Sequence, residues 1–201
     1  MENNLKYNNN PNDPRINSTK SIFSSSFYFE DFYDDKSLMK FIKSIESMIR
    51  KSREYKTYIS SLSAVSSGLA RDNILSNIAV GDACIEFHHY PFDLKTIVEM
   101  VIMSHISRHD KFTSFSLCHE ILDLHYRNLI GLVPLSSTSH ELVHLNSILI
   151  KSDQIFGDWR KLLEIYHDGI SIEQEEKIKE LDEISTTNIP SDYLGIFDNG
   201  L

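Results

Sequence analysis

The stretch "IEFHHYPF", Ile85 to Phe92, decides the fold, because it places two adjacent histidines at the end of a predicted strand. Residues alternate in character from Ala83 to His88, which is typical of a strand, and Pro91 ends it. A second fragment, "HELVH" at His140 to His144, carries two more histidines at positions i and i+4. On a helix such a pair lies on one face, where two imidazoles can share one metal ion.

The segments around these fragments predict a mainly α fold with one small β-hairpin. The apolar run "IGLVPL" predicts a strand that pairs with the first one. Asp93 is placed to cap one helix, and Ser137 or Thr138 is placed to cap the helix that carries "SHELVHLN". The other predicted helices cover about 36–60, 94–108, 114–127, 153–166 and 171–184.

Composition divides the chain into four segments. Residues 1–25 form an Asn- and Ser-rich arm that is expected to be disordered or ordered by a partner. Residues 26–67 hold a basic amphipathic helical segment, and residues 68–168 hold both histidine fragments with helices inserted between them. Residues 169–201 are expected to form an acidic helix and an irregular tail.

The chain has the composition of a globular protein. It has 201 residues, of which 41% are hydrophobic, and a mean hydropathy of -0.26. No apolar run approaches the roughly 20 residues needed to cross a bilayer, so no membrane contact is expected. The first residues lack the apolar stretch of a signal peptide, and two cysteines are too few for a disulfide framework. We therefore expect an intracellular protein.

Charge is spread unevenly along the chain. The net charge of -9 argues against nucleic acid as a partner, because phosphate contacts need clustered Lys and Arg. However, residues 36–56 carry seven basic and two acidic side chains, whereas residues 164–183 carry eight acidic and two basic ones. One face could therefore meet a polyanion, although two solvated helix faces would give the same pattern.

The fragment "HELVH" also matches the HExxH signature of zinc metalloproteases. That interpretation makes Glu141 the general base and requires a third ligand further along the chain, for which Glu164 is available. Two features count against it. In the protease families the motif lies well inside a long helix, whereas Pro134 and the "SSTS" run place His140 in the first turn. The protease interpretation also leaves "FHHYPF" unexplained.

Both fragments together resemble the HNH endonuclease family, whose ββα-metal core places a strand with histidines beside a helix with two more. "IEFHHYPF" resembles the strand that carries the family's first histidine, and "LVPLSSTSHELVH" resembles its strand-to-helix segment. The long helices are similar to those of small HNH proteins encoded by tailed bacteriophages. The resemblance implies that His88, His140 and His144 bind one divalent ion (Zn²⁺, Mg²⁺, Mn²⁺ or Ni²⁺) and that His89 is the general base.

The chain departs from the family pattern at three places. The middle Asn of the family falls near Gly131, and Asn128 is the nearest candidate to replace it. The zinc-ribbon cysteines of many members are Ser136 and Ser139 here, so no second structural metal is expected. Two predicted helices also stand between the histidine fragments, where compact members have a short loop.

These observations lead to two main hypotheses. The first is a phage-encoded, metal-dependent DNA endonuclease acting in the host cytoplasm, in which His89 and Asn128 are catalytic. A set of basic residues would then hold the DNA backbone: Lys40, Lys43, Arg50, Lys51 and Arg53. The second is a non-catalytic HNH-like protein of the phage particle that makes assembly or DNA contacts, with a phage or host protein as a further partner. The zinc protease is a distant third.

Overall fold

The computed structural model describes residues 26–27, 34–75, 78–79, 81–145 and 147–186. The arm predicted over residues 1–25 and the tail beyond residue 186 lie outside the described residues. The described α-helices are α1 (Asp35–Lys51), α2 (Arg53–Leu62), α3 (Leu94–Ser107), α4 (Ser114–Tyr126), α5 (Ser137–His144), α6 (Trp159–Ile165) and α7 (Ile172–Thr186). Single 3-10 turns are η2 (Val65–Ser67), η3 (Ser152–Gln154) and η4 (His167–Gly169). None of the described helices combines the length and apolarity needed to span a membrane.

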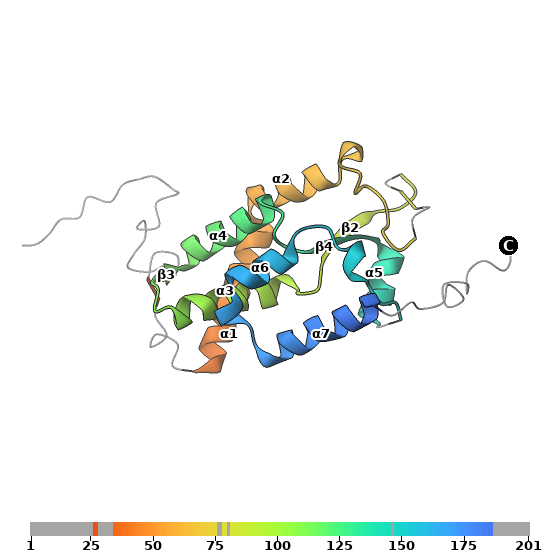
Figure 1. Ribbon diagram of the computed structural model, residues 1–201. Coiled ribbons are helices and arrows are strands. Elements are labelled where there is room, and N and C mark those ends of the chain that lie inside the picture. Colours follow the sequence, from red (N-terminus) through yellow and green to blue (C-terminus); the bar gives the residue numbers. More distant parts are fainter. Residues whose placement is uncertain (1–25, 28–33, 76–77, 80, 146, 187–201) are drawn as a thin grey trace, which may run out of the picture.

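The strands form two small antiparallel pairs. β2 (Ile85–His89) pairs with β4 (Leu132–Ser136), and β1 (Ser26–Phe27) pairs with β3 (Phe112–Thr113). The prediction of a mainly α fold with a small two-stranded sheet is therefore confirmed (Figure 1). The β1–β3 pair was not predicted, because strands of two residues each are too short to show alternation.

The main core lies between α1, α3 and α4. Side chains at helical spacing on these three helices are almost fully excluded from solvent, among them Ile42, Ile45, Ile49, Ile97, Val101, Leu117 and Ile121. α3 is apolar on most of its surface, which fits its position between the other helices. α5 packs beside the β2–β4 sheet, and α7 runs along the bottom of the view (Figure 1), where its Ile178 packs against the main core.

The helix predicted over 36–60 is two helices, which is a correction. The chain bends at Ser52, whose backbone is extended (φ -63°, ψ 150°). The Ser52 amide donates to the end of α1, while its hydroxyl oxygen accepts from Tyr55 N at 3.1 Å and so caps α2. One serine thus ends one helix and begins the next, and the hydrophobic spacing alone does not reveal such a break.

Other helix boundaries follow from local capping. Asp93 caps α3 as predicted, with its carboxylate accepting from Thr96 N at 2.7 Å. The cap of α5 is Ser136, one residue before the predicted positions, because its hydroxyl lies 3.3 Å from Ser139 N. The helix predicted over 153–166 is reduced to η3 and the short α6, which Asp158 caps.

Candidate metal centre

Three histidines converge where β2 meets α5. Alternation along β2 directs the adjacent side chains of His88 and His89 to opposite faces. β4 pairs with β2 and passes directly into α5, so the first turn of this helix begins beside the strand. His140 and His144 lie one turn apart on α5 and face His88.

The ring nitrogens are spaced as metal ligands are. His140 Nε2 lies 3.0 Å from His88 Nδ1 and 3.2 Å from His144 Nε2. One ligand atom from each of the three residues lies within 4.8 Å of those of the others. Tetrahedral coordination with metal–nitrogen distances of about 2.0–2.1 Å would separate ligand nitrogens by about 3.3 Å. The residues therefore fit a metal ion without a large rearrangement.

Electrostatics keeps one of these imidazoles neutral. Burial, followed by the neighbouring His140 and His144, lowers the pKa of His88 to about 4. At neutral pH the ring is then uncharged, and neutral imidazole is the form that binds metals. Sequence reasoning did not single out Glu86, whose carboxylate oxygen lies 3.4 Å from His140 Nδ1.

His89, the predicted general base, points into the core. Its side chain is 6% exposed and its Nε2 lies 3.1 Å from Nε2 of His125, a fully buried residue of α4. His125 Nδ1–H donates to the Ile121 carbonyl at 2.7 Å, so its Nε2 is the acceptor and His89 the donor. The ring of Tyr55 lies parallel to that of His89 and meets the ring of His125 edge-on. Burial lowers the pKa of His89 well below its usual value.

The other predicted catalytic residue, Asn128, contacts Tyr58, whereas His89 contacts His125. Asn128 is exposed, with a positive φ of 52°, in the turn between α4 and β4. Its side-chain oxygen accepts a hydrogen bond from Tyr58 at 3.2 Å. Gly131 has no room for a side chain, because a Cβ there would lie 2.0 Å from the Tyr90 carbonyl oxygen. The position that matches the family's Asn is thus closed by the backbone.

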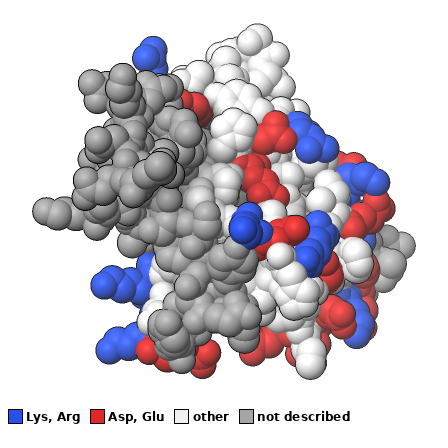
Figure 2. Space-filling model, turned by 90° about the vertical axis from the view of Figure 1, so that its left-hand side faces the viewer, with Lys and Arg blue, Asp and Glu red and all other residues white. Residues whose placement is uncertain are grey.

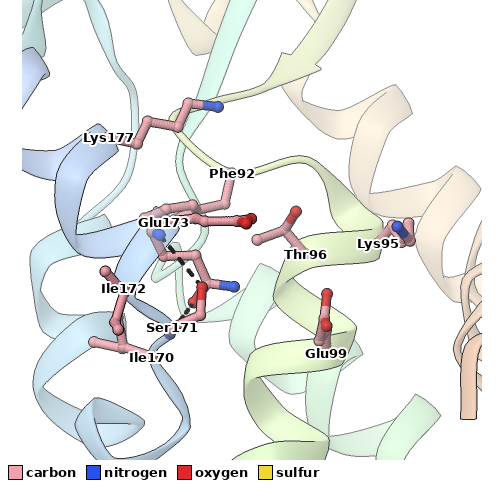
Figure 3. Close-up of a pocket in the computed structure, with 10 residues that line it drawn as sticks. Phe92, Lys95, Thr96, Glu99, Ile170, Ser171, Ile172, Glu173 and Lys177 are labelled. Atoms are coloured by element: carbon pink, nitrogen blue, oxygen red, sulfur yellow. Dashed lines mark hydrogen bonds between the residues drawn. The ribbon is translucent and has the colours of Figure 1, made fainter. Parts of the chain in front are cut away.

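Two pockets lie along α7, and Lys177 borders both. The wider one, about 720 Å³, lies between α7 and the first turns of α3 (Figure 3). The narrower one, about 350 Å³, is lined by His88, His89 and His144. Four carboxylates and two ammonium groups line the two pockets: Asp93, Glu99, Glu173, Glu180, Lys95 and Lys177. The pockets are therefore more acidic than basic.

The predicted DNA-binding residues follow one side of α1. Lys40, Lys43, Arg50 and Lys51 fall within a stripe about 100° wide at the spacing of an α-helix. They and Arg53, at the start of α2, are all exposed, and Arg50 pairs with Glu46 at 3.0 Å. Figure 2 shows one end of the molecule, where basic and acidic side chains are interspersed. On that face the described residues form no continuous positive surface.

Among the described residues, the protease interpretation gains no third ligand further along the chain than His144. Glu141 is exposed, and Glu164 lies on α6, where it pairs with Lys161. Within the described part of the chain, the group whose ligand atoms lie close enough to share an ion consists of three histidines.

Fold and site define a mainly helical protein with a trihistidine cluster at the junction of a small sheet and a short helix. The chain belongs to the family of bacteriophage G278-like virion proteins, whose sequence model matches residues 1–195. No curated protein and no solved structure matches it. The membership confirms the phage origin and associates the chain with the virion, but it does not support membership of the HNH endonuclease family.

Proposed function

We propose that this virion protein is a structural, non-catalytic component of the phage particle. In this proposal a divalent metal ion, bound by His88, His140 and His144, stabilises its fold. One observation carries the proposal: three imidazoles meet at the surface end of β2, while the adjacent His89 is buried against His125. A base that takes a proton from water must reach the reacting atoms directly or through one water molecule. A structural cross-link requires only the three ligands.

The donor set favours a borderline transition metal. Three imidazole nitrogens suit Zn²⁺ or Ni²⁺, whereas Mg²⁺ demands oxygen ligands in near-ideal octahedral geometry. When bound, such an ion supplies a cross-link between β2 and α5. His88 and His140 are 52 residues apart in the chain, so this cross-link would join two segments that are otherwise held by packing and strand pairing.

The experiment measures metal binding and stability together. At a free Zn²⁺ concentration of 100 times Kd, a site present only in the folded state adds about 2.7 kcal/mol. For a chain of this length that corresponds to a rise in Tm of about 5–11 °C. Calorimetry should give one ion per chain, and His140→Ala should lose both the binding and the rise in Tm.

The matched control is His119→Ala, because His119 is exposed on α4 and belongs to a different helix from the cluster. It should bind Zn²⁺ like the wild type. Binding that survives His140→Ala, or a wild type that takes up no ion, contradicts the proposal.

An HNH-type endonuclease is the second candidate. It is favoured by the order of the elements, two antiparallel strands followed by a helix with two of the three ligands, and by the exposure of His144. The burial of His89 and the carboxylates of Asp93 and Glu180 in the pocket beside the cluster count against it, since both carboxylates repel a phosphodiester. Plasmid cleavage with added Mn²⁺, Ni²⁺ or Zn²⁺ that disappears in His140→Ala and in His89→Ala would make this candidate the better one.

A further inference from the structure

Glu86 lies on the same face of β2 as His88. The two residues are separated by one position, and alternation along the strand turns both side chains toward α5. From there the Glu86 carboxylate reaches Nδ1 of His140 at 3.4 Å, while Nε2 of the same ring points to the other two histidines. His140 thus has a carboxylate on one ring nitrogen and the cluster on the other.

This arrangement selects one tautomer of His140. A carboxylate accepts hydrogen bonds and cannot donate them when ionised, so it favours the proton on Nδ1. The lone pair is then left on Nε2, where it faces the centre of the cluster. His140 is also the ring nearest to both partners, which makes its Nε2 the atom on which the cluster depends most.

We propose that Glu86 is the positioning residue of the metal centre: it orients His140 and holds the proton on Nδ1, so that Nε2 is ready to bind the ion. This inference rests on the proposed function. The contact contributes little to folding, because Glu86 is 51% exposed.

The test compares Glu86→Ala with Glu141→Ala, using Zn²⁺ as the probe. Both substitutions remove one exposed carboxylate close to the cluster in sequence, but the structure gives Glu141 no contact with a ligand ring. Glu86→Ala should weaken Zn²⁺ binding by about 10- to 100-fold, which is the usual effect of losing such a partner. Glu141→Ala should bind like the wild type, and Glu86→Gln, which keeps an acceptor without the charge, should lie between.

A second readout separates positioning from a structural role. In the metal-free protein, nitrogen NMR should report a proton on Nδ1 of His140 in the wild type and a mixture of tautomers in Glu86→Ala. The Tm of the metal-free proteins should be equal. Equal affinities of wild type and Glu86→Ala, or an unchanged tautomer, overturn the role of Glu86 alone. A wild type that binds no Zn²⁺ overturns the proposed function, and the role of Glu86 with it.

Discussion

Stability at acid pH should depend on the buried histidine pair, and His125→Phe tests this. Phe keeps a ring between Tyr55 and Tyr58 but removes both nitrogens. At pH 7.5 the variant should be less stable than the wild type by about 1–3 kcal/mol, because the His89 N–H loses its acceptor inside the core.

The difference should shrink as the pH falls. Burial is the largest cause that lowers the pKa of His125, which falls from 6.5 to about 4. A histidine whose pKa is lower in the folded state adds stability above its unfolded pKa, and this stability is lost as the pH falls from about 6.5 to about 4. The difference between these two pKa values corresponds to about 3 kcal/mol of stability, which the wild type loses and the variant does not. The two free energies of unfolding should therefore converge or cross near pH 4.

Urea unfolding of both proteins at several pH values between 4 and 7.5 measures this difference directly. Carboxylates that are protonated over the same range are common to both proteins and cancel. His119→Phe, on the exposed side of the same helix, is the control and should show a difference that does not change with pH. A difference between wild type and His125→Phe that stays constant across the range refutes the reasoning.

Three further predictions concern other parts of the molecule. Gly131→Ala should destabilise the fold by about 3 kcal/mol in urea unfolding, because its methyl group meets a backbone oxygen that cannot move away freely. His105→Gln should cost more stability at pH 6 than at pH 9, since the hydrogen bond to Glu120 raises the pKa of His105 and stability from such a group is lost as the pH rises through that value. If α1 contacts DNA, Lys40→Glu with Lys43→Glu should reduce retention on duplex DNA and lower the salt slope by about 2, whereas unchanged retention would exclude this surface.

The sequence predicts those features that repeat along one element. Alternation located β2 and turned His88 and His89 to opposite sides, and the Asp93 cap located α3. Which of the two side chains faces the core was not predictable, because this depends on the partners that tertiary packing supplies. His125 is 36 residues from His89, and no local pattern marks it as the acceptor that draws His89 into the core.

The cap at Ser52 and the contact between Glu86 and His140 were missed for a related reason. Ser52 follows a basic run in which hydrophobic spacing continues, so the bend is set by one hydroxyl and one backbone angle. Glu86 reads as an ordinary polar residue on the alternating strand, and it gains its importance only because α5 brings His140 to the same face. Single contacts between distant elements leave no periodic signal in the chain.

The segment between β2 and β4, which holds α3 and α4, separates the ligands of the histidine cluster along the chain. His140 and His144 lie on one helix, whereas His88 reaches them only when β2 pairs with β4 across that segment. Closing such a loop is an entropic cost that non-local packing repays late. A chain in which α5 has formed but β2 and β4 have not paired therefore offers two ligands, and the folded chain offers three. The complete cluster thus distinguishes the folded protein from its partly folded forms.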